Sequence, residues 1–392
     1  MKDDSLHPAL ETEEETRPLW LLSREGQSVW LDYIRRGILD NGELERMIRE
    51  DAVRGVTSNP AIFEQAIGRS DDYDEVLADM AASGVEPIDA YERLAIEDIQ
   101  RAADLFRAIY DGSGGADGFV SLEVSPELAH DTRGSLEEAR RLWTAVARPN
   151  VMIKIPGTEE GLSAIEEALY EGINVNVTLL FSLAGYAKVM ERYLRALERR
   201  AEAREPLDRI ASVASFFVSR VDTAVDARLE EAAEGVATDA ERERILALRG
   251  RAAIANAKMA YRRFQDVFAS ERFSALRAAG ARVQRPLWAS TSTKNPEYRD
   301  VLYVEQLIGP DTVNTMPLAT LRAFGDHGVA RRTVDRDVED ARDDLRQLDA
   351  LGIDLKEVTR QLQVEGVEKF VHPFRDLLRS IEGKLTQVAQ RG

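Results

Sequence analysis

The sequence NVMIKIPGTEEG at residues 150–161 predicts a buried β-strand that runs into a loop and then into a helix. Side chains alternate between the two faces of a strand. The three β-branched residues of this strand therefore share one face, which we expect to contact covering helices. Lys154 lies on the opposite face, in the middle of the strand. A lysine at such a position needs a structural or chemical reason, which other residues of the chain must indicate.

Lysine is almost never fully buried unless it is paired. Desolvation disfavours the charged ammonium form, and a neutral amine is a nucleophile that forms a Schiff base with a ketone. The alternative is that Lys154 lies near a strand end, where it reaches water or pairs with an acid. Residues elsewhere in the chain must decide between these two interpretations.

The composition narrows the class of protein. The chain has 392 residues, of which 44% are hydrophobic and 31% charged, enough for one large barrel or two ordinary domains. The net charge of −18 makes nucleic acid an improbable partner. We expect no membrane association, because no apolar run is long enough to span a bilayer. The N-terminus lacks an apolar signal core, so a cytoplasmic location is the default expectation.

Metal and cofactor sites are not indicated. The chain has no cysteine, which excludes disulfides, thiolate catalysis and cysteine-ligated metals. Its four histidines are scattered without ligand-like spacing, and there is no dinucleotide or P-loop fingerprint. We therefore expect neither a metal nor a cofactor. An acidic protein that binds a phosphate ester would still need a local basic pocket.

Eight short strand candidates alternate with helical sequence. They are residues 28–34, 55–58, 119–125, 150–156, 173–180, 210–221, 286–290 and 311–317. In the fifth candidate, Asn174, Asn176 and Thr178 alternate with aliphatic residues, which indicates a polar barrel interior rather than a solvent-exposed face. The pattern predicts an α/β fold of the (β/α)8 TIM-barrel type.

The segments outside the repeating pattern define the expected domains. Residues 1–17 form a polar tail, and residues 18–328 form the barrel. The helical stretch at about 222–280 is longer than a crossover needs, so we interpret it as an insertion before the seventh strand. Residues 329–392 are helical and highly charged, and we expect them to form an extension packed on the outside of the barrel.

Polar residues recur near the carboxyl ends of the predicted strands, where such barrels place their active sites. They are Asp32, Asn59, Glu123, Lys154, Asn176, Thr178, Ser215, Arg220, Ser290 and Lys294. Some have simpler explanations: Asn59 precedes a proline and suits a turn, and the carboxylates could merely pair with Lys154. The convergence of many inward polar residues on one end of the barrel favours the Schiff-base interpretation of Lys154.

Six stretches carry a family resemblance. They are GVTSNP at 55–60, SLEV at 121–124, VMIKIP at 151–156, INVNVTLLFS at 173–182, FFVSR at 216–220 and NTMP at 314–317. Together and in this order they resemble a transaldolase of the longer bacterial type. The resemblance implies transfer of a dihydroxyacetone unit from sedoheptulose 7-phosphate to glyceraldehyde 3-phosphate. The products would be erythrose 4-phosphate and fructose 6-phosphate, in the non-oxidative pentose phosphate pathway, without a cofactor and in a monomer or homodimer.

The resemblance also implies roles for individual residues. Lys154 would form the Schiff base, and Asp32 would be the base for the C4 hydroxyl. Glu123 would act as the acid and base that dehydrates the carbinolamine, through a water held by Thr178. The residues that would bind the dihydroxyacetone part of the substrate are Thr57, Asn59, Asn176 and Ser215.

The phosphate site departs from the family pattern. Arg220 and Ser290 match an arginine and a serine of the family, but the second arginine of shorter transaldolases is missing. Lys294 is the substitute that the loop after the seventh strand offers, with a point charge in place of a bidentate fork. The alternative is that Lys294 is an ordinary surface lysine.

Two other functions remain open. A fructose 6-phosphate aldolase on the same barrel would release dihydroxyacetone; such aldolases typically have glutamine at the Glu123 position and tyrosine at the Phe217 position, so both residues here favour the transferase. A non-catalytic sugar-phosphate-binding protein is the second alternative. Loss of Lys154, Glu123 or Asp32 would have supported it, and all three are present.

Overall fold

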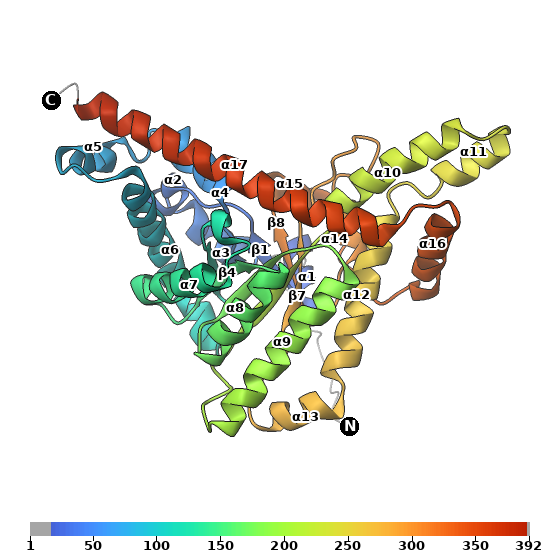
Figure 1. Ribbon diagram of the computed structural model, residues 1–392, viewed down its shortest axis with the longest axis horizontal. Coiled ribbons are helices and arrows are strands. Elements are labelled where there is room, and N and C mark those ends of the chain that lie inside the picture. The colour runs from blue at the N-terminus through green and yellow to red at the C-terminus, as the bar shows by residue number, and fades with distance from the viewer. Residues whose placement is uncertain (1–16, 390–392) are drawn as a thin grey trace, which may run out of the picture.

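The computed structural model describes residues 17–389 as a closed barrel of eight parallel strands in sequence order (Figure 1). The strand β8 pairs with β1 and closes the barrel. The strands are β1 (Gln27–Leu31), β2 (Val53–Val56), β3 (Phe119–Glu123), β4 (Val151–Pro156), β5 (Val175–Leu180), β6 (Ser212–Phe217), β7 (Arg285–Ala289) and β8 (Thr312–Met316). The predicted TIM barrel is confirmed. The expected polar tail at 1–17 lies outside the described residues, apart from Arg17.

Helices follow the strands around the barrel, as the alternating pattern predicts. The helices up to β6 are α1 (Pro18–Arg24), α2 (Arg36–Asp40), α3 (Glu43–Glu50), α4 (Pro60–Phe63), η2 (Glu64–Gly68), α5 (Asp74–Ala82), α6 (Pro87–Gly112), η3 (Pro126–Leu128), α7 (Thr132–Val146), α8 (Glu159–Tyr170) and α9 (Leu183–Glu202). The later ones are α10 (Ser219–Glu234), α11 (Asp239–Leu246), α12 (Ala252–Phe268), α13 (Glu271–Ala278), α14 (Leu302–Gln306), α15 (Leu318–His327), α16 (Val338–Ala350) and α17 (Leu355–Ala389).

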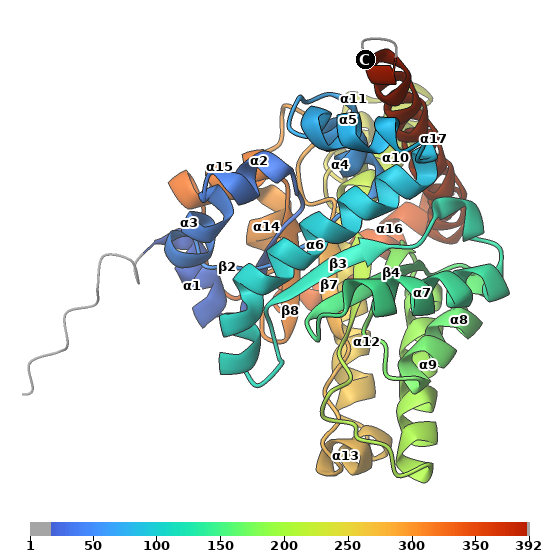
Figure 2. The ribbon, with the colours of Figure 1, turned by 90° about the vertical axis from the view of Figure 1, so that its left-hand side faces the viewer.

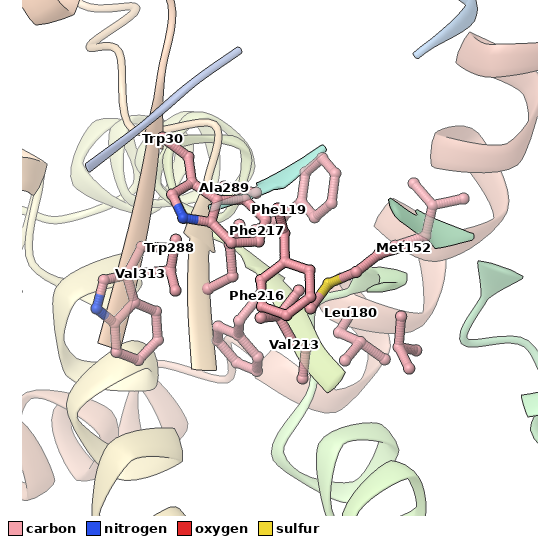
Figure 3. Close-up of a cluster of buried hydrophobic side chains, with 14 of the residues drawn as sticks. Trp30, Phe119, Met152, Leu180, Val213, Phe216, Phe217, Trp288, Ala289 and Val313 are labelled. Carbon is pink, nitrogen blue, oxygen red and sulfur yellow. The ribbon is translucent and has the colours of Figure 1, made fainter. Parts of the chain in front are cut away.

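The strand register brings the inward polar residues together. Glu123 on β3 is paired with Lys154 on β4, and Lys154 is paired in turn with Asn176 on β5. These three residues therefore form one layer across neighbouring strands. Trp30 of β1 and Met152 of β4 belong to the buried hydrophobic cluster shown in Figure 3. The barrel interior therefore contains apolar side chains as well as the polar layer around Lys154.

Side-chain hydrogen bonds fix the stretch at 150–161. Asn150 donates through Nδ2 to the carbonyl oxygens of Ala103 and Gly118, at 2.8 Å each, which anchors the start of β4. Thr158 caps the following helix, α8, by accepting a hydrogen bond from the Gly161 amide at 3.1 Å. The chain therefore turns from strand to helix within a few residues, and this turn leaves Lys154 close to the carboxyl end of the barrel.

Two details differ from the sequence prediction. The sixth strand ends at Phe217, and Arg220 lies in the first turn of α10 rather than at the end of the strand. The sequence at 71–112 looks helical throughout, but the stretch is divided into α5 and α6, because Gly84 adopts a left-handed conformation with φ +68 and Pro87 begins the next helix. Both differences concern where helices begin and leave the barrel unchanged.

The long helix α17 belongs to the expected C-terminal extension, residues 329–392. It crosses the carboxyl end of the barrel (Figures 1 and 2). Gln363 of α17 donates through Nε2 to the carbonyl oxygens of Gly157 and Leu179, at 3.0 and 3.3 Å, beside the ends of β4 and β5. The reason is a stripe of buried apolar residues along the helix, namely Leu362, Phe370, Phe374, Leu377 and Ile381.

We predict that Gly161→Ala lowers the free energy of unfolding by about 1–3 kcal/mol. A Cβ at this position would lie well under 3.0 Å from the carbonyl oxygen of Pro156, a backbone atom that cannot move aside without shifting β4. Urea unfolding followed by circular dichroism measures the change.

Gly383→Ala is the matched control for Gly161→Ala. Gly383 is an exposed glycine of α17, and no atom lies within 4 Å of the point that an alanine Cβ would occupy. Alanine there should therefore be neutral or stabilising by up to about 1 kcal/mol. Equal effects of the two substitutions would contradict the close packing at the start of α8.

Candidate active site

Lys154 and Glu123 form a buried ion pair between neighbouring strands. The Lys154 Nζ lies 3.2 Å from Oε2 of Glu123, and the two side chains are only 6% and 3% exposed. The Lys154 Nζ also donates a hydrogen bond to the carbonyl oxygen of Ser58 at 3.0 Å. These two contacts fix the position of the Lys154 amine. Because the amine lies at the carboxyl end of the barrel, a ligand bound there can contact it.

Burial disfavours the ionised carboxyl groups around this amine. It raises the pKa of Glu123 to about 7; the Lys154 charge acts in the opposite direction, and the Asp32 charge raises the pKa further. Burial also raises the pKa of Asp32, against the effects of Lys154 and of a hydrogen bond from Thr57. An acid whose pKa lies near neutrality both donates and accepts protons at physiological pH.

Several buried oxygens near Lys154 have no hydrogen-bond partner. Among the described residues, Oε1 of Glu123 and Oγ1 of Thr178 have no hydrogen-bond partner, and Oε2 of Glu123 has only the ion pair with Lys154. Buried polar atoms are usually satisfied. These atoms are therefore available to a hydroxyl group of a bound ligand or to a water.

Asp32 is oriented by a chain of hydroxyl groups. Thr57 donates through Oγ1 to Oδ1 of Asp32 at 2.7 Å, and its hydroxyl also contacts that of Thr315 at 2.6 Å. The single hydroxyl proton of Thr57 is already used, so Thr315 is the donor in the second contact. Thr315 was not among the predicted site residues. Its position in the NTMP motif at the end of the eighth strand was a signal that could have identified it.

Asn176 is fully buried, and its side chain is satisfied inside the barrel. Its Nδ2 donates to the hydroxyl of Ser121 at 3.0 Å, and its Oδ1 accepts from the hydroxyl of Ser215 at 2.7 Å. Asn176 therefore links β3, β5 and β6 and sets the position of Ser215. Asn59 has two roles. Its Oδ1 caps α4 by accepting a hydrogen bond from the Ile62 amide at 3.0 Å, as the turn interpretation predicts. The Asn59 residue also lines a cavity.

This cavity, of about 150 Å³, lies at the carboxyl end of the barrel. Most of the predicted site residues line it, namely Asp32, Thr57, Asn59, Lys154, Thr178, Ser215, Phe217, Arg220, Ser290 and Lys294. Glu123 and Asn176 are not part of the cavity lining and flank Lys154 in the adjacent strands. The lining residues that sequence reasoning missed are Ala289, Ser292, Thr315, Pro317 and Phe370.

One wall of the cavity is basic. Burial lowers the pKa of Arg220, whose guanidinium group lies 5.4 Å from the ring centroid of Phe217. Partial burial and the charge of Arg220 lower the pKa of Lys294, which donates to the hydroxyl of Ser292 at 2.8 Å. Neither cation forms an ion pair within residues 17–389. The charge of Glu365 acts on Arg220 without a direct ion pair. Two neighbouring cations still favour binding of an anion.

Ser290 lies beside this basic wall in a left-handed conformation with φ +57, and its hydroxyl lies 2.9 Å from that of Ser219 at the start of α10.

Over the part of the chain that the structure describes, no three histidine, aspartate or glutamate side chains are grouped to hold a metal ion. None of the described helices is both long enough and apolar enough to cross a membrane.

Comparison with known proteins identifies the class of this barrel. A family model described as transaldolase/fructose-6-phosphate aldolase matches residues 29–381. Transaldolase 1 of Streptomyces coelicolor is 50% identical over 365 residues, which cover 93% of this chain and 94% of the relative. Transaldolase 2 of Nostoc sp. is 45% identical over 92% of this chain and 95% of its own length. The transaldolase of Mycolicibacterium smegmatis is 47% identical, covering 93% and 96%.

The chain belongs to the transaldolase/fructose-6-phosphate aldolase family. The family resemblance predicted from the six sequence stretches is confirmed.

The raised pKa of Glu123 predicts a pH dependence of stability. The folded protein keeps the Glu123 proton up to about pH 7, whereas the unfolded chain loses it near its ordinary pKa of 4.5. Between these values the folded state binds more protons, so this group makes the free energy of unfolding fall as the pH rises. Relative to wild type, Glu123→Gln should gain stability across this window, by roughly 3 kcal/mol at most.

Urea unfolding of both proteins at several pH values across this window measures the effect. Glu75→Gln, which removes an exposed glutamate on α5, controls for the change in net charge. A difference between wild type and Glu123→Gln that stays constant with pH would show that Glu123 is ionised throughout.

Proposed function

We propose that Lys154 is the Schiff-base nucleophile of this enzyme. The supporting observation is a buried amine, 3.2 Å from a carboxyl group, at a cavity whose lining also includes two cations. The enzyme catalyses the transaldolase reaction: it transfers a dihydroxyacetone unit from sedoheptulose 7-phosphate to glyceraldehyde 3-phosphate in the pentose phosphate pathway. Erythrose 4-phosphate and fructose 6-phosphate are the products.

The reaction begins at the amine. Glu123 takes a proton from Lys154 across their 3.2 Å contact, and the neutral Nζ attacks the C2 ketone of the donor sugar. The C2 oxygen takes a proton from the attacking nitrogen, which gives a carbinolamine. Glu123, whose pKa lies near neutrality, then returns its proton, and the C2 hydroxyl leaves as water. Thr178 holds the water through which this proton moves, since its hydroxyl has no hydrogen-bond partner. The product is a protonated imine, which withdraws electrons from the neighbouring carbon.

Asp32 then acts as the base. It takes the proton of the C4 hydroxyl, and the C3–C4 bond breaks. The electron pair of this bond moves into the imine and gives an enamine on Lys154. The C4 carbonyl leaves as the aldehyde erythrose 4-phosphate. C3 of the enamine attacks the aldehyde carbon of glyceraldehyde 3-phosphate. Asp32 returns its proton to the new C4 oxygen, which becomes a hydroxyl group. Hydrolysis of the imine then frees fructose 6-phosphate. The Thr57 hydroxyl holds Asp32 in place at 2.7 Å.

The remaining site residues bind the substrate. Thr57, Asn59 and Ser215 face the cavity and are suited to the hydroxyl groups of the dihydroxyacetone part. Asn176 contributes by orienting Ser215. The phosphate group lies against Arg220 and Lys294, with Ser290 beside them, because charge-assisted hydrogen bonds from two cations bind a dianion strongly. Phe217 forms the apolar side of this wall.

Two residues favour transfer over the aldolase reaction that also occurs in this family. The chain has Glu123 and Phe217 at positions where fructose 6-phosphate aldolases typically have glutamine and tyrosine. The partners of the enzyme are small sugar phosphates. We expect a monomer or homodimer that acts in the cytoplasm, where the intermediates of this pathway are found.

We predict that Lys154→Met reduces transaldolase turnover by on the order of 10⁴-fold or more, because the variant lacks the buried amine that forms the imine. Methionine keeps the length of the side chain, and circular dichroism checks that the barrel is folded. Lys356→Met, at an exposed position of α17, is the control and should keep wild-type turnover. Near-normal turnover by Lys154→Met would refute the mechanism.

We predict that Lys294→Ala raises the KM for fructose 6-phosphate by roughly ten-fold while leaving kcat nearly unchanged. A charge-assisted hydrogen bond contributes about 1.5–3 kcal/mol, and the phosphate is distant from the bonds that break. Lys294→Arg keeps the charge and should retain most of the affinity. An unchanged KM for Lys294→Ala would make Lys294 an ordinary surface lysine.

A further inference from the structure

Phe370 is a residue of the cavity that the mechanism above does not use. It comes from α17, far from the barrel strands in sequence, and its side chain is buried, with 5% exposure for the residue. The centre of its ring lies 5.9 Å from the Lys154 Nζ, and the ring lines the same cavity as Asp32 and Thr178. The amine of Lys154 therefore has a carboxyl group on one side and an aromatic ring close to it.

Contacts of the same helix face hold this ring in place. Gln363 and Gly366 precede Phe370 by two turns and one turn of α17, so the three residues share a face. Gln363 donates to the carbonyl oxygens of Gly157 and Leu179. A Cβ on Gly366 would lie only 3.0 Å from Cδ2 of Leu179, so the helix approaches the end of β5 closely. The distance between the ring and Lys154 is set by the docking of α17 rather than by the side chain alone.

The chemistry at Lys154 depends on whether water reaches it. After the C3–C4 bond breaks, a three-carbon enamine remains on the amine and has two possible fates. In transfer, C3 attacks the aldehyde carbon of the acceptor. In release, C3 takes a proton, and water attacks C2 of the resulting imine, which frees Lys154 and dihydroxyacetone. Both fates end in hydrolysis of an imine, and they differ in whether C3 of the enamine takes a proton or the aldehyde carbon of the acceptor. An apolar group beside the amine disfavours release, because it keeps proton-donating water away from C3 of the enamine.

We propose that Phe370 determines the outcome of the reaction by shielding the Lys154 adduct from water, which favours transfer over release of dihydroxyacetone. The inference rests on the proposed Schiff-base function of Lys154. It assigns to α17 a role in specificity besides its packing on the barrel. Phe370 complements Glu123 and Phe217, the two residues that distinguish this chain from the aldolases of the family.

The test measures both fates in one mixture. Wild type, Phe370→Ala and Phe370→Leu receive fructose 6-phosphate and erythrose 4-phosphate. Sedoheptulose 7-phosphate reports transfer, and free dihydroxyacetone, reduced by glycerol dehydrogenase and NADH, reports release. We expect Phe370→Ala to raise the ratio of release to transfer on the order of ten-fold, the scale at which small changes in an apolar pocket alter discrimination. Phe370→Leu, which keeps part of the apolar cover, should give a smaller rise.

Leu377→Ala is the matched control. Leu377 lies on α17, is fully buried and does not line the cavity, so alanine there loosens the helix without uncovering Lys154. It should lower the melting temperature as Phe370→Ala does and leave the ratio unchanged.

An unchanged ratio in Phe370→Ala, or an equal rise in Leu377→Ala, would overturn the proposal. If Phe370→Ala fails to fold, Phe370→Leu decides by the same comparison. Absence of transfer in the wild type would instead refute the proposed function itself.

Discussion

The burial of a lysine beside a glutamate is the constraint on which the rest of the structure depends. Moving two charges out of water costs several kcal/mol per ion, which only close pairing and further hydrogen bonds offset. Lys154 has Glu123 at 3.2 Å and the Ser58 carbonyl at 3.0 Å. The parallel register of β3 and β4 produces this pairing, since it sets Glu123 opposite Lys154. The unpaired buried oxygens of Glu123 and Thr178 leave the pair incompletely satisfied, as a site that binds a polar ligand requires.

Much of the site followed from the sequence because a parallel barrel is a regular object. Side chains alternate along each strand, and all carboxyl ends meet at one end of the barrel, so inward polar residues near strand ends must converge. Most of the residues chosen in this way, including Asp32 and Thr178, line one cavity. Asn176 was expected to face the substrate directly. Its partners Ser121 and Ser215 come from other strands, and no local pattern reveals that they satisfy its side chain.

The features that could not be predicted depend on contacts between distant parts of the chain. Gln363 and Gly157 are 206 residues apart in sequence, and their hydrogen bond is one of the contacts that seat α17 over the barrel. The apolar stripe and charged residues of this helix fit any position on the outside of the barrel, so the sequence did not indicate that it covers the carboxyl end. Phe370 consequently escaped notice as a lining residue. Arg220 was placed on the sixth strand because aliphatic sequence continues past Phe217, whereas the backbone already becomes helical at Ser219.

The cavity thus combines groups of different origin around one amine. The strands and the residues directly after them supply the base and the hydroxyl groups, and Glu123 flanks the amine on β3. The loop after β7 and the start of α10 supply the cations, and α17 supplies an aromatic cover. The central claim is that the amine of Lys154 forms the covalent bond to the substrate. Reduction with borohydride in the presence of fructose 6-phosphate, followed by peptide mass spectrometry, tests it most directly. The account predicts one reduced dihydroxyacetone adduct on Lys154, and an adduct on another lysine, or none on the folded protein, would contradict it.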